Sequence, residues 1–229
     1  VIAMAGSGAN VVLNGITGSI GLEPSIAALK AGSQLALANK ESVVAGGHLL
    51  FSAQVRENQI NPVDSEHSAI WQSLRSGTHA EVAKLVVTAS GGPFRGWTRE
   101  QTRDVTPEMA VSHPNWSMGA KISVDSATMM NKGLEFIEAM HLFGVTPDDI
   151  QVLIHPESVV HSMVELLDGT VIAQLGVPDM RIPIQYALTY PARVPGVVPE
   201  LDFTTLKLLT FDVADEETFR CLAACKKAI

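Results

Sequence analysis

The chain has 229 residues, of which 46% are hydrophobic and 17% are charged, and its formal net charge is −8. A chain of this length can bury a substantial core, as one large domain or as two small ones. The acidic balance argues against nucleic acid as a partner. The sequence also has no uninterrupted apolar run of about eighteen residues, which a membrane-spanning helix would need.

The ends of the sequence suggest where the protein works. Residues Val1–Gly6 lack the basic head and long apolar stretch of a signal peptide, and they lack an initiator methionine. We therefore expect a piece of a longer protein. Cys221 and Cys225 stand four residues apart in a segment with a helical pattern. We interpret them as reduced thiols on one helix face rather than a metal or redox pair, and we expect a cytoplasmic protein.

The first sixty residues alternate between predicted strands and predicted helices. The pattern predicts strands at 11–13, 34–38 and 59–63, and helices at 21–31 and 41–56. This alternation favours a parallel sheet of βαβ units, in which chemistry collects at the carboxyl ends of the strands. Asn39–Glu41 and Asp64–Glu66 both follow a predicted strand directly.

The rest of the chain predicts a mixture of strands, helices and one long irregular segment. Strands are expected at 84–89 and 151–154, a hairpin at 162–175, and helices at 127–143, 182–190 and from about 216. Residues 92–119 show no periodicity, although they include Trp97, Trp116 and Met118. A long irregular segment inside a compact domain is either disordered or a functional lid.

Three carboxylates indicate a divalent-cation site. Asp64 and Glu66 are two residues apart, and on extended backbone this spacing points both side chains to one side. Glu135 offers a third carboxylate in the helix predicted at 127–143. Oxygen ligands of this kind suit Mg²⁺ or Mn²⁺. Taken alone, the first pair is more often a solvated strand end.

A possible phosphate site precedes the third carboxylate. Ser126, Asn131 and Lys132 offer a hydroxyl, an amide and an amine. Ser126 is expected to precede or begin the long helix, where free N–H groups and the helix dipole favour an anion. The alternatives are a simple N-cap for Ser126 and a solvated helix face for the other two. Metal and phosphate together indicate an enzyme that acts on a phosphorylated small molecule.

Seven segments of the sequence occur in the order found in one enzyme family. They are Leu37–Ser42, Pro62–His67, Ala89–Phe94, His113–Gly119, Lys121–Glu135, Ile154–Pro156 with Val160–Met163, and Pro178–Arg181. Through them the chain resembles the 1-deoxy-D-xylulose 5-phosphate reductoisomerases of the non-mevalonate route to isoprenoid precursors. The resemblance implies an α/β protein in which residues 1–60 are the end of a Rossmann-like, NADPH-binding parallel-sheet domain. Residues 61–212 would be an α+β central catalytic and dimerisation domain with a lid loop at about 91–119, and 213–229 would lead to a missing C-terminal helical domain.

The resemblance also implies a reaction and its partners. Family members convert 1-deoxy-D-xylulose 5-phosphate to 2-C-methyl-D-erythritol 4-phosphate. Mg²⁺ or Mn²⁺ organises the rearrangement, by a retro-aldol or an α-ketol route, and NADPH supplies the hydride. A homodimer is implied, to which the edge of the predicted hairpin is a plausible contributor. Two alternatives stay open: a fragment that binds metal and phosphate without turnover, and another metal-dependent sugar-phosphate isomerase or aldolase.

Residue roles follow from the same resemblance. The implied metal ligands are Asp64, Glu66 and Glu135, and these act in catalysis with Lys40 and His113. The implied substrate-binding residues are Lys40, Ser65, Glu66, Ser90, His113, Trp116, Ser126, Asn131, Lys132 and Glu135. The implied cofactor-binding residues are Asn39, Glu41, Gly119 and Met180.

A glycine-rich motif lies near the start of the chain. Gly15–Gly21 follows a predicted strand and opens a helix, as a dinucleotide fingerprint would. Leu35–Asn39, about twenty residues on, offers no charged group to read a ribose. The position also matches a second glycine-rich turn of the family rather than its pyrophosphate loop. We therefore interpret the motif as a structural turn.

Overall fold

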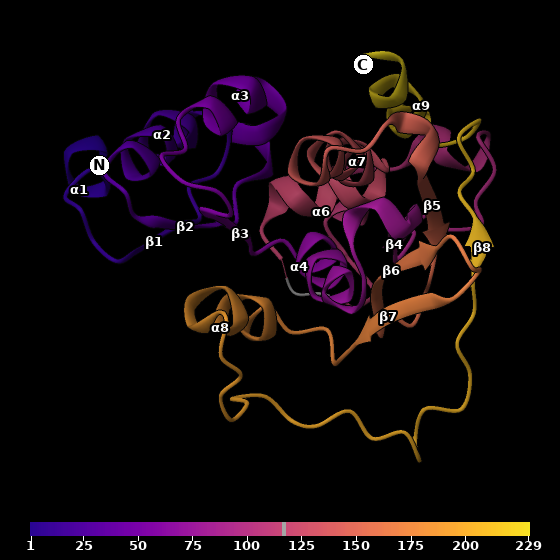
Figure 1. Ribbon diagram of the computed structural model, residues 1–229. Coiled ribbons are helices and arrows are strands. Elements are labelled where there is room, and N and C mark those ends of the chain that lie inside the picture. The colour runs from indigo at the N-terminus through magenta and orange to yellow at the C-terminus, as the bar shows by residue number, and fades with distance from the viewer. Residues whose placement is uncertain (116–117) are drawn as a thin grey trace.

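The computed structural model describes residues 1–115 and 118–229, which form two β-sheets with helices packed against them (Figure 1). The first sheet has the strand order β1–β2–β3, and its strands all run parallel. They are β1 (Val11–Asn14), β2 (Gln34–Leu37) and β3 (Ile60–Pro62). The parallel sheet expected from the alternating pattern is confirmed.

Three helices accompany the first sheet. They are α1 (Ile2–Ala5), α2 (Leu22–Lys30) and α3 (Lys40–Ser52). Pro24 lies in the first turn of α2, where its missing N–H is not needed. Asn39 caps α3, because its side-chain oxygen accepts a hydrogen bond of 2.6 Å from the N–H of Ser42. This cap places Lys40 at the first position of α3, directly after β2.

The second sheet is mixed and has the strand order β7–β6–β4–β5–β8. Its strands are β4 (Val82–Ala89), β5 (Ile150–Ile154), β6 (Val160–Leu166), β7 (Val171–Leu175) and β8 (Asp212–Val213). β4 is parallel to β5 and antiparallel to β6, which pairs antiparallel with β7. The predicted hairpin is confirmed, and Gly169 adopts a positive φ of 83° in its turn.

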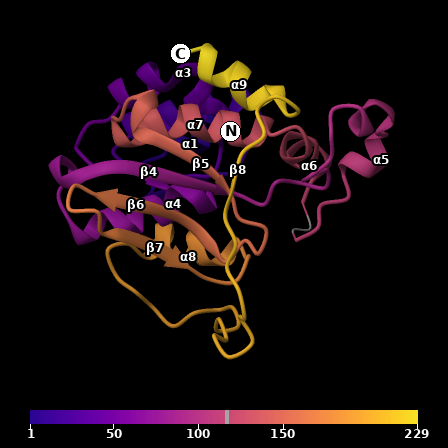
Figure 2. The ribbon, with the colours of Figure 1, turned by 90° about the vertical axis from the view of Figure 1, so that its right-hand side faces the viewer.

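The helices around the second sheet supply most of its core. They are α4 (Ser65–Ser73), α5 (Pro107–Ala110), α6 (Ala120–Ala127), α7 (Met130–Phe143), α8 (Arg181–Thr189) and α9 (Arg220–Lys227). The largest buried core cluster includes Ile70, Leu85, Val87, Phe136, Phe143 and Leu222. In Figure 2, α9 lies along α7 at one end of the molecule, and the segment after α8 loops out at the opposite end. Within the described ranges, no helix is long and apolar enough to cross a bilayer.

The helix predicted at 127–143 is two helices in the structure. Met129 adopts a left-handed conformation with a φ of 61°, which ends the run of α6 and starts α7 at Met130. A positive φ is uncommon for a residue with a side chain, and no glycine marks the break in the sequence. The final helix also begins later than predicted, at Arg220 rather than at about 216.

A second difference concerns the first two carboxylates. The prediction placed Asp64 and Glu66 on extended backbone, and this was wrong. Asp64 is the N-cap of α4, and its Oδ1 accepts a hydrogen bond of 3.3 Å from the N–H of Glu66 in the first turn. The two side chains therefore converge because a helix starts between them. Helix α4 was not expected from the pattern.

The two sheets are joined by close packing of α3 on α7. A Cβ atom at Gly47 would lie 2.7 Å from the imidazole ring of His141, so this position admits no side chain unless His141 moves. Across the molecule, α8 returns to the first sheet, where the Asn61 amide donates a hydrogen bond of 2.8 Å to the Ala187 carbonyl. These contacts bring the start of α3 against α7, which carries Glu135.

Candidate active site

A cavity of about 240 Å³ lies where β2, β3, β4 and β5 end. The sequence predicted that polar residues would collect at strand ends of the first sheet, and the cavity draws on both sheets. It is lined by these predicted residues: Lys40, Asp64, Ser65, Glu66, Ser90, His113, Ser126, Asn131, Lys132, Glu135 and Met180. Trp116, the remaining predicted substrate contact, lies outside the described residues.

Three carboxylates meet at one wall of the cavity. Asp64 caps α4, Glu66 lies in its first turn, and Glu135 projects from the middle of α7. One oxygen from each lies within 4.8 Å of the others. Glu135 is only 1% exposed and Asp64 only 8% exposed. Such buried carboxylates require cations close by.

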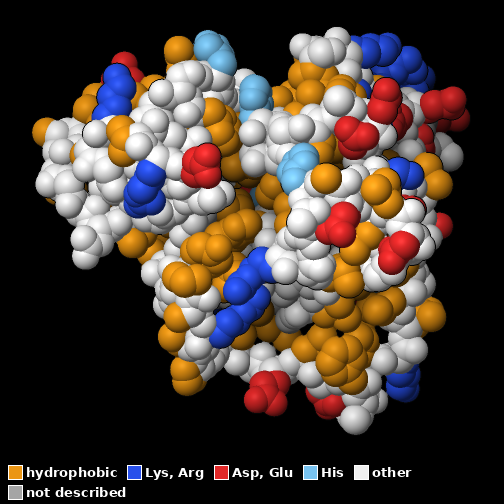
Figure 3. Space-filling model, viewed as in Figure 1, with side chains coloured by type: hydrophobic (Ala, Val, Ile, Leu, Met, Phe, Trp, Pro, Cys, Tyr) orange, Lys and Arg blue, Asp and Glu red, His pale blue; other side chains and the backbone are white. Residues whose placement is uncertain are grey.

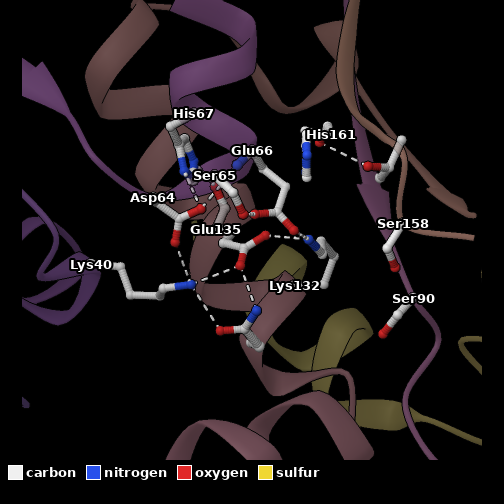
Figure 4. A network of polar contacts seen from close by, with 12 residues as sticks. Lys40, Asp64, Ser65, Glu66, His67, Ser90, Lys132, Glu135, Ser158 and His161 are labelled. Atoms are coloured by element: carbon white, nitrogen blue, oxygen red, sulfur yellow. Dashed lines mark hydrogen bonds and ion pairs between the residues drawn. The ribbon is translucent and has the colours of Figure 1, made fainter. Parts of the chain in front are cut away.

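Two lysines supply that positive charge (Figure 4). The Nζ atom of Lys40 lies 2.6 Å from Oδ2 of Asp64 and 2.7 Å from Oε1 of Glu135. The Nζ atom of Lys132 lies 2.7 Å from Oε1 of Glu66 and also contacts Oε2 of Glu135. Glu135 therefore binds both lysines, one with each oxygen.

The electrostatics of this cluster favour the charged forms of Lys40, Lys132 and Asp64. Burial alone would lower the pKa of Lys40, but the negative charges of Asp64 and Glu135 outweigh it and hold that pKa well above its usual range. The pKa of Lys132 is raised in the same way, because Glu135 and Glu66 outweigh its burial. Burial would raise the pKa of Asp64, but the Lys40 ammonium lowers it below its usual range.

A histidine and a fourth carboxylate lie directly behind the cluster. His67 Nδ1 is 3.3 Å from Oδ1 of Asp64 and 3.4 Å from Oε2 of Glu138. Its Nε2 lies 2.9 Å from the backbone oxygen of Glu135. Burial would lower the pKa of His67, but Glu138 and Asp64 raise it to about 9, whereas burial raises the pKa of Glu138 to about 7.

Glu138 was missed by sequence reasoning, and so was any role for His67. A signal was present, because Glu138 follows Glu135 by three residues and therefore shares its face of a helix. His67 follows Asp64 by the same interval, on α4. Neither interval is informative until the two helices are known to face each other.

Ser90, Ser126 and Asn131 line the same cavity as Lys132. The Asn131 side chain accepts a hydrogen bond of 2.8 Å from Nζ of Lys40 and donates one to Oε1 of Glu135. Ser126 lies in the last turn of α6, and the N-cap of α7 is Met129, so the predicted place of Ser126 at a helix start was wrong. Gly92 packs on that turn, where a Cβ atom would lie 2.7 Å from the Ser126 carbonyl oxygen. The absence of a side chain at Gly92 thus lets the loop after β4 reach the end of α6.

His113 joins the same side of the cavity. Its Nε2 is 2.9 Å from Oγ of Ser90, and its Nδ1 accepts a hydrogen bond of 3.1 Å from the N–H of Asn115. The Asn115 amide donates a hydrogen bond of 3.0 Å to Oγ of Ser158, which also lines the cavity and was not predicted. Partial burial lowers the pKa of His113, so its neutral form is favoured.

Two of the four predicted cofactor residues line a second cavity of about 340 Å³. Glu41, Gly119 and residues 15–17 line it, and it shares Lys40 and Asn131 with the first cavity. Asn39 lies beside it, but its amide donates to the Gly18 carbonyl at 2.8 Å and to the Ile16 carbonyl, while its oxygen caps α3. Met180 lines the first cavity instead.

Comparison with known families accounts for this arrangement. Three family models match the chain: 1-deoxy-D-xylulose 5-phosphate reductoisomerase over residues 1–47, its C-terminal domain over 60–143, and a further reductoisomerase C-terminal domain over 175–229. The chain belongs to the 1-deoxy-D-xylulose 5-phosphate reductoisomerase family. The family resemblance read from the seven sequence segments is therefore confirmed.

Curated reductoisomerases are similar to almost the whole chain. The enzyme of Bifidobacterium longum (strain DJO10A) is 68% identical, over 99% of this chain and 59% of its own length. The enzyme of Beutenbergia cavernae is 58% identical, over 99% of this chain and 57% of its own length. The chain thus spans somewhat less than three-fifths of these reductoisomerases.

Solved reductoisomerase structures have the same fold. The Zymomonas mobilis enzyme in complex with NADPH superimposes with a TM-score of 0.91 at 46% identity, covering 99% of this chain and 59% of that one. A reductoisomerase in complex with NADPH, fosmidomycin and magnesium superimposes with a TM-score of 0.93, also at 46% identity and with the same coverage. The α/β fold expected from the sequence is confirmed.

Proposed function

We propose that this chain forms the metal and substrate-phosphate site of an NADPH-dependent enzyme that converts 1-deoxy-D-xylulose 5-phosphate to 2-C-methyl-D-erythritol 4-phosphate. The observation that carries the proposal is the convergence of Asp64, Glu66 and Glu135 beside the side chains proposed to hold phosphate, in one cavity. The relatives' shared name and the solved complex with NADPH, fosmidomycin and magnesium support it.

The three carboxylates fit a hard divalent cation. Mg²⁺ binds oxygen at about 2.1 Å, so two ligands of one ion lie at most about 4.2 Å apart. The carboxylate oxygens already lie within 4.8 Å of one another, so small side-chain movements suffice. Asp64, Glu66 and Glu135 would hold the ion, and Mn²⁺ suits the same ligands. When bound, the ion supplies Lewis acidity toward the ketone and hydroxyl oxygens of the substrate.

Lys40 and Lys132 have different tasks in this proposal. The ammonium of Lys40 reaches the cavity beside Asp64 and Glu135, where it would stabilise negative charge that develops on a substrate oxygen. Lys132 would bind the phosphate together with Ser90, Ser126 and Asn131, which line the same cavity. His113 would contact the substrate from its position against Ser90, and Ser65 from the start of α4.

The second cavity is the proposed place of the NADPH nicotinamide end. It borders the first cavity through Lys40 and Asn131, and Glu41 and Gly119 lie on its wall. Asn39 does not line this cavity, but its amide donates a hydrogen bond to the Gly18 carbonyl and so fixes the turn at Gly15–Gly21 beside the cavity. In this proposal residues 1–60 end the nucleotide domain, 61–212 form the catalytic and dimerisation domain with a lid at about 91–119, and 213–229 lead to a C-terminal helical domain.

The proposed partner is a second copy of the chain. β7 is an edge strand of the second sheet, and Val171 on it is 50% exposed. Phe203 and Leu208, on the extended segment after α8, are each 66% exposed. Figure 3 shows hydrophobic side chains on the lower part of the face where this segment and β7 lie. An exposed strand edge beside apolar side chains favours pairing with another copy.

Titration calorimetry tests the metal and phosphate site. A phosphonate–hydroxamate substrate mimic is expected to bind the complete protein with Mn²⁺, and to lose that binding with EDTA or in Asp64→Asn. Asp168→Asn is the matched control, because Asp168 lies in the exposed hairpin turn. Binding that ignores both EDTA and Asp64→Asn would overturn the proposal.

Two further measurements separate the alternatives. Sugar-phosphate turnover without NADPH would favour an isomerase or aldolase over a reductoisomerase. If the 229-residue chain binds the mimic but not NADPH, while the complete protein binds both, the chain alone is a binding fragment.

Cys221 and Cys225 are free thiols in the structure, which agrees with the proposed cytoplasmic location.

A further inference from the structure

His67 contacts two of the proposed metal ligands at once. Its Nε2 lies 2.9 Å from the backbone oxygen of Glu135, and its Nδ1 lies 3.3 Å from Oδ1 of Asp64. The carbonyl oxygen of Glu135 accepts a hydrogen bond from Nε2, whereas Nδ1 makes no aligned hydrogen bond with any described residue. The ring has no exposed surface, so its position is set by the groups packed around it.

Glu138 is the second carboxylate beside Nδ1 of this ring. Its Oε2 lies 3.4 Å from Nδ1 of His67, and its side chain is only 1% exposed. Neither Oε2 of Glu138 nor Nδ1 of His67 makes an aligned hydrogen bond with any described residue, so this contact brings together two buried polar atoms that have no other aligned partner. A buried carboxylate without an aligned partner is costly, and no role in binding substrate explains it, because Glu138 does not line the cavity.

We infer that Glu138 is a positioning residue of the metal site: it holds His67 against Asp64 and the backbone of Glu135. The inference rests on the proposed metal site. Helix α7 carries both Glu135 and Glu138, and helix α4 carries His67 next to its cap, Asp64. The Glu138–His67 contact therefore ties these two helices together directly behind the ligands. Groups that orient metal ligands from behind typically change metal affinity by about 10- to 100-fold when they are removed.

The test is Mn²⁺ affinity, measured by calorimetry or by the electron paramagnetic resonance of free Mn²⁺, on the complete protein without substrate. Glu138→Gln keeps the size of the side chain and removes its charge, and it is expected to weaken Mn²⁺ binding by about tenfold or more. In a His67→Gln background, the same substitution is expected to have no further effect, because Glu138 acts through the ring.

Ile137→Val is the matched control for general damage to α7. Ile137 is buried on the same helix, and the substitution removes one methylene, so it lowers stability while leaving Mn²⁺ affinity unchanged. If Glu138→Gln does not fold, Glu138→Asp takes its place, because it withdraws the carboxylate from Nδ1 and keeps the charge. Its Mn²⁺ affinity is expected to fall as well.

The outcomes distinguish this inference from the proposed function. The positioning role would be overturned if Glu138→Gln bound Mn²⁺ with wild-type affinity. It would also be overturned if the affinity losses of Glu138→Gln and His67→Gln simply multiplied in the double variant. Asp64→Asn is measured beside them. If Asp64→Asn binds Mn²⁺ as well as the wild type does, the metal site itself is wrong. If only Asp64→Asn loses Mn²⁺ affinity, the proposed metal site is supported and the positioning role of Glu138 is refuted.

Discussion

Lys40 and Glu135 are 95 residues apart in the chain, yet a hydrogen bond of 2.7 Å joins Nζ of Lys40 to Oε1 of Glu135. Lys40 begins α3 beside the first sheet, and Glu135 lies on α7 beside the second. Each is almost completely buried. The bond therefore depends on the packing of α3 against α7 as much as on either side chain.

Replacing Lys40 by Met should unbalance the carboxylate cluster. Removing one partner of a buried ion pair costs about 3–5 kcal/mol, so the free energy of unfolding in EDTA is expected to fall by about 3 kcal/mol. Added Mn²⁺ is expected to restore part of it by supplying positive charge. Urea denaturation with and without Mn²⁺ measures both effects.

Lys121→Met is the control for this experiment. Lys121 pairs with Glu41 and Asp125 at the surface, where its side chain is 48% exposed. Exposed pairs contribute about 0–1 kcal/mol, so a much smaller loss is expected. Equal losses in the two variants, or a Lys40→Met loss that Mn²⁺ does not reduce, would contradict the proposed charge balance.

Gly92→Ala should damage the proposed phosphate side of the cavity. Gly92 has a φ of +69°, and a Cβ atom there would lie 2.7 Å from the Ser126 carbonyl oxygen. The loop and the end of α6 must then move apart, and affinity for the phosphonate mimic is expected to fall by about tenfold or more. Calorimetry on the Mn²⁺-loaded protein measures this.

Gly96→Ala separates the clash from the backbone strain. Gly96 also has a positive φ, of +80°, but a Cβ atom there would meet nothing within 4 Å. Both alanine variants should lose about 1–2 kcal/mol of stability from the positive φ, and only Gly92→Ala should lose affinity. A similar loss of affinity in both would show that the Gly92–Ser126 contact is not responsible.

Gly47→Ala should weaken the contact between α3 and α7. Alanine normally favours a helix over glycine, but here its Cβ atom would meet the ring of His141 at 2.7 Å. Overpacking of this kind costs about 1–3 kcal/mol, which urea denaturation resolves. In a His141→Ala background the ring is gone, so Gly47→Ala is expected to be neutral or stabilising there. A loss that persists in that background would place its cause elsewhere.

Val171→Lys should disfavour the proposed dimer. A lysine on an edge strand blocks its pairing with another chain, and Val171 is exposed enough for the fold to tolerate it. Analytical ultracentrifugation of the complete protein is expected to show a shift from dimer to monomer. Val213→Lys, on β8 at the other edge of the same sheet, is the control. A shift caused by the control instead would assign the dimer to that edge.

Local patterns predicted the strands well. The first sheet was readable because short apolar runs alternate with helical patterns and glycine ends the first long helix at Gly32. Helix α4 could not be predicted from the sequence pattern, because Ser65–Ser73 mixes polar and small residues without a clear apolar face. The break at Met129 was equally hidden, since nothing in the sequence marks a methionine that adopts a left-handed conformation.

The candidate site was predicted through resemblance more than through pattern. Carboxylates, serines and lysines were named individually, but their convergence depends on contacts between residues far apart in the chain. Glu138 and Ser158 could not be identified from sequence, because their roles arise from what faces them: the ring of His67 and the amide of Asn115. Such facing is a property of helix and loop packing, which no local pattern encodes.

The position of Lys40 ties the net charge of the cluster to the packing of the two sheets. Asp64, Glu66, Glu135 and Lys132 all lie between residues 64 and 135, whereas Lys40 begins α3, beside the first sheet. If α3 moved away from α7, the three carboxylates would keep one ammonium instead of two and would attract a cation more strongly. The packing of the first sheet against the second therefore sets how strongly the three carboxylates draw a cation to themselves.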